Sequence, residues 1–113
     1  MKTEKTSKFF TYNQNNSGGV FDINKEKGIG EYVIVEAMNS NDADARAEAI
    51  GLYFDGVEDG MDCDCCGDRW YSQYDEGSEE PLIYGQSPED CKNKTIAVHY
   101  LDGSVKCYDG NWD

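Results

Sequence analysis

Hydrophobic residues in the first part of the chain fall into short blocks whose composition is typical of β-strands. Residues 8–12 (Lys-Phe-Phe-Thr-Tyr) are mostly aromatic and β-branched, and residues 20–23 form a second apolar block. The intervening residues 13–19 are all asparagine, glutamine, serine or glycine, which favour a long turn. This pattern predicts a hairpin in which 8–12 pairs with 20–23.

The clearest strand follows at residues 31–37 (Glu-Tyr-Val-Ile-Val-Glu-Ala), whose middle residues are apolar without alternation. We therefore expect a central strand that is covered on both faces. Residues 41–51 have an asparagine that can cap a helix, acids in the first turn, an alanine-rich body and a final glycine, so they predict one short helix. One face of this helix carries Ala43, Ala47 and Ile50.

The second half of the chain has weaker signals until its last hairpin. Residues 70–74 and 81–85 predict short strands, although glycine and proline limit the second. Residues 87–90 (Ser-Pro-Glu-Asp) predict a helical turn. Residues 95–101 and 104–108 are two strand-like blocks joined by Asp-Gly, which is the strongest hairpin signal in the sequence.

Together these elements predict an α+β fold. We expect an antiparallel sheet of about five or six strands with one short helix packed on it, in a single small domain that comprises residues 1–113. Residues 1–7 are expected to be flexible.

The charge of the chain restricts its partners. The formal net charge is −13, so a general basic surface for DNA, RNA or an anionic membrane is not expected, whereas a basic protein is a suitable partner. No apolar run approaches the roughly 20 residues that a membrane-spanning helix needs. The first residues lead into no apolar signal core, and we therefore expect a cytoplasmic protein.

Residues 62–70 (Asp-Cys-Asp-Cys-Cys-Gly-Asp-Arg-Trp) concentrate specialised side chains in one short stretch. Its three thiols, together with one more ligand from Cys91, Cys107 or His99, have the number of groups that a structural zinc ion needs. The spacing lacks the usual Cys-x-x-Cys pairs, and buried or free thiols are the competing interpretation. The candidate zinc ligands are Cys63, Cys65, Cys66 and Cys91.

The same stretch also resembles the start of an EF-hand calcium loop, but the position of the bidentate glutamate is Gln73, so this reading fails. Arg69 stands among many acids, and an ion pair within the loop competes with a ligand-binding role. Trp70 is expected to be a hydrophobic plug beneath the loop.

The polar loop after the first strand is the principal ligand-site candidate. Its amide, hydroxyl and glycine groups suit hydrogen bonding to a polar ligand or a backbone nest for phosphate, whereas the competing reading is a turn that only needs positive φ. Seven such residues exceed what a tight hairpin requires, which favours a functional loop. The candidate ligand-binding residues are Tyr12, Asn13, Asn15, Asn16, Ser17, Gly18 and Arg69.

Catalysis is not expected. His99 is the only histidine and lies in a predicted strand, where a structural role is commoner than that of a general base. A cysteine nucleophile needs a base or a positive environment, whereas the cysteines at 63–66 adjoin aspartates that would raise their pKa.

Three segments carry a family resemblance: residues 8–21 (Lys-Phe-Phe-Thr-Tyr-Asn-Gln-Asn-Asn-Ser-Gly-Gly-Val-Phe), residues 49–54 (Ala-Ile-Gly-Leu-Tyr-Phe) and residues 65–70 (Cys-Cys-Gly-Asp-Arg-Trp). With these motifs the chain resembles a group of small, largely uncharacterised proteins encoded by tailed bacteriophages. The resemblance covers about residues 8–85 and implies a phage product made in the host bacterial cytoplasm. It implies no activity and no residue roles.

Small non-enzymatic phage proteins often act by occupying a host molecule, and this context leaves two main hypotheses. In the first, the polar loop sequesters a nucleotide-like small ligand as a counter-defence measure. In the second, acids such as Asp62, Asp64 and Asp68 mimic DNA phosphates and inhibit a host nucleic-acid-binding protein. A minor virion or assembly protein is a third alternative, a homo-oligomer is compatible with all three, and structural zinc is the one cofactor considered.

Overall fold

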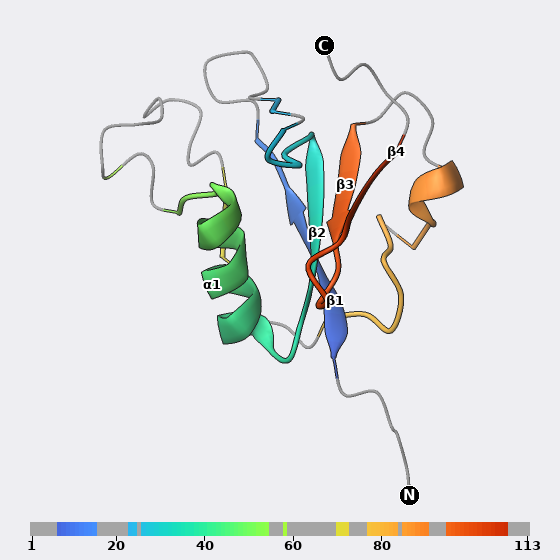
Figure 1. The fold of residues 1–113 in the computed structure, drawn as a ribbon, viewed down its shortest axis with the longest axis horizontal. Coiled ribbons are helices and arrows are strands. Elements are labelled where there is room, and N and C mark those ends of the chain that lie inside the picture. Colours follow the sequence, from blue (N-terminus) through green and yellow to red (C-terminus); the bar gives the residue numbers. More distant parts are fainter. Residues whose placement is uncertain are drawn as a thin grey trace, which may run out of the picture.

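The structure is a computed structural model, and it describes residues 7–15, 23–24, 26–54, 58, 70–72, 77–83, 85–90 and 95–108 (Figure 1). Within these ranges the elements follow the order β1 (Lys8–Asn13), β2 (Tyr32–Ala37), α1 (Ser40–Ile50), η2 (Pro88–Asp90), β3 (Ile96–His99) and β4 (Val105–Tyr108). The chain is therefore a small α+β domain, and the predicted single short helix is confirmed for the described residues.

The strands form a four-stranded sheet in the order β1-β2-β3-β4. Strand β2 is antiparallel to β1 but parallel to β3, and β3 is antiparallel to β4. For the described residues the sheet therefore has four strands where five or six were predicted, and it is mixed where a purely antiparallel sheet was predicted, because one of its three pairs is parallel. The connection between β2 and β3 contains α1 and is long enough to return the chain to the same end of the sheet, which a parallel pair requires.

Strand β1 takes a different partner from the predicted one. It pairs with β2 along its whole length, from Lys8 opposite Ala37 to Asn13 opposite Tyr32. Residue 23 lies outside any strand, and residues 20–22 lie outside the described residues. All six residues of β2 are buried, so β2 offers β1 a long buried partner, which a short block such as 20–23 cannot match.

The later elements agree with the sequence in part. The last hairpin is confirmed as β3 and β4, with Gly103 at φ +95° in its turn, and the helical turn at 87–90 is confirmed as η2. The predicted strands at 70–74 and 81–85 are not present in the described residues. Ile83 makes only an isolated bridge with Gln86, because the chain turns back on itself there.

The helix α1 begins and ends with side-chain and backbone caps. Asn39 is the N-cap, two residues before the predicted Asn41, and its Oδ1 accepts a hydrogen bond of 2.8 Å from the Asp42 N–H. Gly51 ends the helix at φ +131°, and its N–H donates to carbonyl oxygens of the last turn. Ala43 and Ala47 are fully buried, as predicted, so the small side chains let α1 lie close to the sheet.

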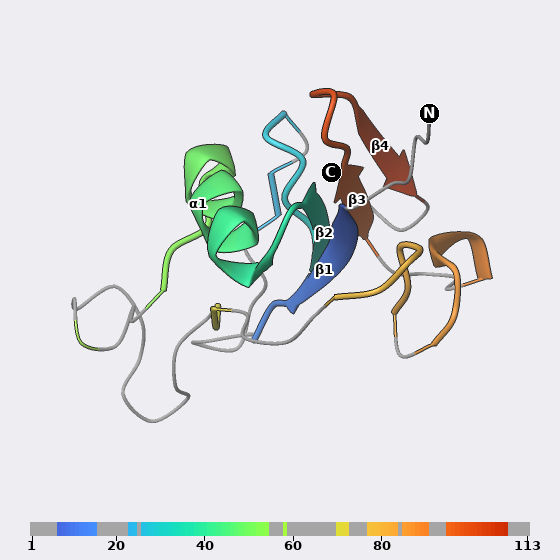
Figure 2. The same cartoon turned by 90° about the horizontal axis from the view of Figure 1, so that it is seen from below.

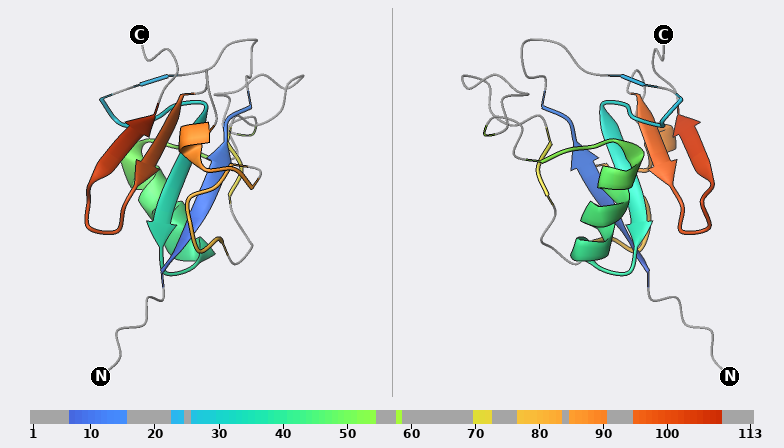
Figure 3. Two further views of the ribbon diagram at one scale, coloured as in Figure 1. Left: turned by 90° about the vertical axis from the view of Figure 1, so that its right-hand side faces the viewer. Right: turned by 60° about the vertical axis from the view of Figure 1, so that its left-hand side comes forward.

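Each face of the sheet carries its own hydrophobic core. Figure 2 and Figure 3 show α1 on one side of the sheet and the segment at 77–90 on the other. The core on the α1 side contains Phe10, Tyr12, Ile29, Val33, Val35, Ala37, Ala43, Ala47, Leu52 and Trp70. The core on the opposite side contains Phe9, Tyr32, Ile34, Ile83, Ile96 and Val98. Trp70 is only 2% exposed, which confirms its prediction as a packing residue.

Candidate functional site

The candidate site lies along the edge strand β1, mainly on the side of the sheet opposite α1. Side chains alternate along β1, so Phe10 and Tyr12 belong to the core beneath α1, whereas Phe9 belongs to the opposite core. Thr11 and Asn13 follow Phe9 with the same alternation. The sequence of β1 therefore sets a row of one aromatic, one hydroxyl and one amide side chain on the face that carries the site.

The segment at 77–85 forms the second wall and is bonded to the outer edge of β1. Phe9 and Ser78 exchange two backbone hydrogen bonds of 2.8 Å, and the Thr11 hydroxyl donates to the Leu82 carbonyl oxygen at 2.8 Å. Gly77 is required for this approach, because it has φ +76° and a Cβ there would lie 2.9 Å from Phe10 Cζ. Glycine thus lets an irregular segment lie directly against a strand edge.

Between these walls lies a pocket with a volume of about 400 Å³. Its apolar lining comes mainly from aromatic and branched aliphatic residues, and Thr11, Asn13 and Ser78 add hydroxyl and amide groups. This volume is within the usual range for small-molecule sites, which combine a mostly apolar wall with a few polar groups. The lining residues are Phe9, Phe10, Thr11, Asn13, Tyr32, Gly77, Ser78, Leu82, Ile83 and Gly85.

The structure separates the predicted ligand-binding residues of the polar loop. Asn13 lines the pocket and is exposed, whereas Tyr12 is 1% exposed on the α1 side, where its hydroxyl donates to Asp44 Oδ1 at 2.7 Å. Gln14 is buried and donates from Nε2 to the Gly30 carbonyl oxygen at 2.9 Å, so it links the end of β1 to the residues that precede β2. Asn15 is half-buried. The other candidates, Asn16, Ser17, Gly18 and Arg69, lie outside the described residues.

The predicted zinc ligands and acidic partner site also lie outside the described residues. These are Cys63, Cys65, Cys66, Cys91, Asp62, Asp64 and Asp68. Among the described residues, no three histidine, cysteine, aspartate or glutamate side chains are grouped to hold a metal ion. Cys107 is exposed on β4, so the alternative of a buried thiol does not apply to it.

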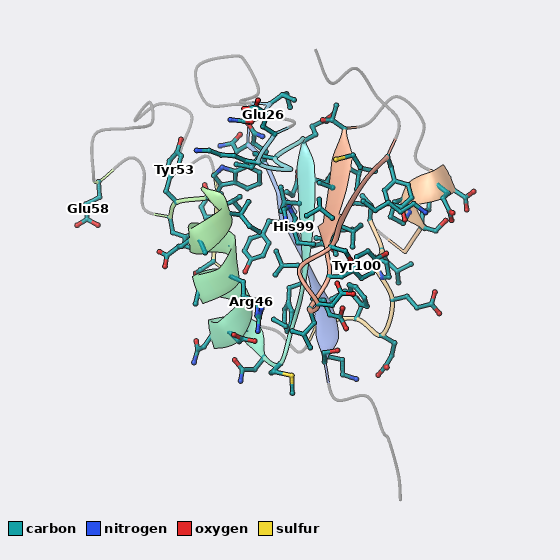
Figure 4. All side chains as sticks on the ribbon, viewed as in Figure 1. Glu26, Arg46, Tyr53, Glu58, His99 and Tyr100 are labelled. Atoms are coloured by element: carbon teal, nitrogen blue, oxygen red, sulfur yellow. The ribbon has the colours of Figure 1, made fainter. Side chains whose placement is uncertain are left out.

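His99 lies on β3, on the α1 side of the sheet (Figure 4). Its Nε2 lies 2.8 Å from the Gly28 carbonyl oxygen, which can only accept, so Nε2 carries the proton of this bond. Burial lowers the pKa of His99, with the bond to Gly28 opposing this shift. A neutral imidazole with a backbone partner fits the expected structural role.

Comparison with known families identifies one match. The model of the Domain of unknown function DUF7296 matches residues 7–113. The chain belongs to this family. No curated protein and no solved structure matches the chain. The family match spans β1 to β4, so it includes every residue of the pocket described above.

No helix in the described part of the chain has both the length and the hydropathy needed to cross a membrane.

Sequence reasoning found one residue of the pocket, Asn13, and missed the rest of its lining. Alternation along residues 8–13 is enough to place Phe9, Thr11 and Asn13 on one face. Residues 81–85 were predicted as a short strand, and no local signal in 77–85 indicates that Ser78 would bond to Phe9, because that contact depends on the three-dimensional path of the chain.

Proposed function

We propose that this chain is a non-enzymatic binding protein that captures a small, nucleotide-like ligand in the pocket between β1 and residues 77–85. The observation that carries the proposal is the pocket itself, which joins an apolar wall to Asn13, the first residue of the polar loop. A nucleobase is flat, largely apolar on its faces and lined at its edge with hydrogen-bonding groups, which matches this division of the lining.

The polar groups of the pocket can both donate and accept hydrogen bonds. Asn13 has an amide and Ser78 a hydroxyl group, while the Thr11 hydroxyl, whose hydrogen is donated to the Leu82 carbonyl oxygen, can act as an acceptor. Together these groups suit the mixed edge of a base or a ribose. Asn16 follows Asn13 by three residues, a distance of at most roughly 11 Å along an extended chain. We therefore assign the phosphate end of the ligand to Asn16, Ser17 and Gly18, with Arg69 as its counter-charge.

The biological setting is part of the same proposal. A chain with the phage-like motifs of residues 8–21 and 65–70 would be made in the cytoplasm of an infected bacterium. Capture of a nucleotide-like signal there would blunt a host defence without any catalytic step. This role requires a stable complex rather than turnover, which agrees with a site built from amide, hydroxyl and apolar groups.

Native mass spectrometry of the full chain purified from infected cells tests the proposal. We expect a bound small molecule, with its affinity lowered about five- to tenfold by Asn13→Ala, because one hydrogen bond to a ligand contributes on the order of 1 kcal/mol or more. Asn41→Ala is the matched control, since it makes the same change at an exposed asparagine of α1. Ligand-free protein throughout, or equal loss in both variants, would overturn the proposal.

The charge of −13 supports a second candidate, an acidic mimic of DNA that inhibits a basic host protein. In this case a nucleic-acid-binding protein should co-purify at low salt and dissociate at high salt. Reversing the charges of Asp62, Asp64 and Asp68 should abolish the association, and an unchanged yield would exclude the mimic. A minor virion protein would instead be found in purified particles.

A further inference from the structure

A second groove lies on the other face of the sheet, between α1 and the β3–β4 hairpin. It has a volume of about 250 Å³ and is independent of the pocket beside β1. Arg46, Ala49 and Ile50 of α1 form one side, while His99 and Gly103 belong to the hairpin side. Arg46 lies on α1 and His99 on β3 (Figure 4), and both residues line the groove.

The arginine of this groove is held in place from one end. Arg46 Nε donates to Asp42 Oδ2 at 3.0 Å, and the same oxygen accepts a hydrogen bond of 3.0 Å from the Met38 N–H. The Met38 N–H and, after it, Arg46 lower the pKa of Asp42, so this anchor stays ionised at neutral pH. A guanidinium has five N–H donors, and the anchoring bond uses one of them. Asp42 is its ion-pair partner among the described residues.

The histidine of the groove supplies the opposite kind of group. The bond from His99 Nε2 to the Gly28 carbonyl oxygen fixes the proton of the neutral ring on Nε2. Nδ1 is then unprotonated and is a hydrogen-bond acceptor. The groove therefore has a fixed cationic donor on its α1 side, a neutral acceptor on its β3 side and the apolar groups of Val35, Ala49 and Ile50 as further lining. Glu36 and Tyr100 also line it, and the two carboxylate oxygens of Glu36 already accept hydrogen bonds from the Ser7 hydroxyl and the Leu101 N–H.

We propose that this groove binds a small carboxylate that carries a hydroxyl or amine group beside its carboxyl group. The carboxylate receives hydrogen bonds from the terminal nitrogens of Arg46, and the neighbouring O–H or N–H donates to His99 Nδ1. The short carbon chain lies against Val35 and Ile50. A volume of about 250 Å³ equals roughly eight water molecules, which is enough for an acid of three or four carbons.

Titration of the isotope-labelled full chain with sodium lactate and sodium acetate, followed by NMR at constant ionic strength, tests this assignment. Lactate has the neighbouring hydroxyl and acetate lacks it. We expect lactate to shift the amide resonances of Ala49, Ile50 and Gly103, and to bind roughly three- to tenfold more tightly than acetate, as one additional neutral hydrogen bond implies. Equal affinities, or shifts no larger than those caused by sodium chloride, would overturn the assignment.

Three variants separate the role of the guanidinium from a general charge effect. Arg46→Gln should weaken lactate binding tenfold or more, because it removes charge-assisted hydrogen bonds, and Arg46→Lys should give an intermediate loss. Lys106→Gln is the matched control, because it also removes one positive charge. Lys106 lies opposite Val98 in the β3–β4 pair, and Val98 belongs to the core on the other face of the sheet, so Lys106 is on the face away from the groove. Equal weakening by Arg46→Gln and Lys106→Gln would refute a specific carboxylate site.

Discussion

Glu36 provides the sharpest test of how this fold is held together. It lies in the central strand β2, is 7% exposed, and joins two distant parts of the chain. Its Oε2 accepts a hydrogen bond of 2.6 Å from the Ser7 hydroxyl, and its Oε1 accepts one of 3.0 Å from the Leu101 N–H. One carboxylate of β2 thus holds both the residue before β1 and the turn of the last hairpin against the central strand.

Two substitutions separate the hydrogen bonds of Glu36 from its charge. Glu36→Gln keeps the shape and an acceptor, but replaces bonds to a charged group with neutral ones, so we expect a loss of about 1–2 kcal/mol in the free energy of unfolding. Glu36→Ala leaves the Ser7 hydroxyl and the Leu101 N–H without this partner, and we expect a loss of about 3–5 kcal/mol. The larger loss is a substantial part of the roughly 5–15 kcal/mol that stabilises a domain.

Urea denaturation measures both losses, and amide hydrogen exchange at Leu101 reports on the hairpin bond alone. We expect faster exchange at this amide in Glu36→Ala than in Glu36→Gln. Ser7→Ala should add little to the loss caused by Glu36→Ala, because both changes remove the same bond. Losses below about 1 kcal/mol for Glu36→Ala, or fully additive losses in the double variant, would refute the view that this carboxylate joins the two segments.

Three further predictions concern other parts of the structure. Gly77→Ala should lower the free energy of unfolding by about 2–3 kcal/mol, because the added Cβ would meet neighbouring side chains at 2.9 Å. Gly85 also has a positive φ, +84°, but no atom lies within 4 Å of the position that a Cβ would take there, so Gly85→Ala should cost only about 1 kcal/mol. Equal losses of the two variants in thermal denaturation would contradict the packing explanation. Tyr12→Phe should cost about 1–2 kcal/mol by removing the bond to Asp44. A double-mutant cycle with Asp44→Asn should give a coupling energy of about the same size, and strictly additive losses would contradict the bond. Burial lowers the pKa of His99 in the folded state, so the free energy of unfolding should rise as pH increases from the folded pKa towards 6.5 and be flat above it. His99→Gln should remove this slope. The same pH dependence of denaturation between pH 5 and 8 in His99→Gln and in the original chain would refute the prediction.

The sequence predicted those elements whose signals are local. The helix α1 has its caps, its alanine face and its final glycine within one short stretch, and the last hairpin has Asp-Gly between two apolar blocks. The central strand β2 was also evident, because its apolar residues are continuous. These features depend on neighbouring residues alone.

The pairing of the strands was not predictable in the same way. A strand that is apolar on both faces is suited to a parallel sheet, yet the same pattern permits an antiparallel central strand, and only the path of the chain decides. The candidate pocket has the same limitation. Asn13 was accessible to pattern reasoning, but Ser78 and Leu82 reach β1 through backbone contacts that no local signal specifies.

The parallel pairing of β2 with β3 also has a consequence for the nascent chain. Glu31 and Thr95, which bond to each other beside this pair, are 64 residues apart. At synthesis rates of roughly 5–20 residues per second, about 3–13 s pass on the ribosome between the appearance of β2 and that of its parallel neighbour. During this interval β1, β2 and α1 can already associate, but one edge of the most apolar strand still has no β3 beside it. Folding of this domain therefore ends with the closing of a long loop, and a chaperone or the ribosome surface has several seconds in which to shield that edge.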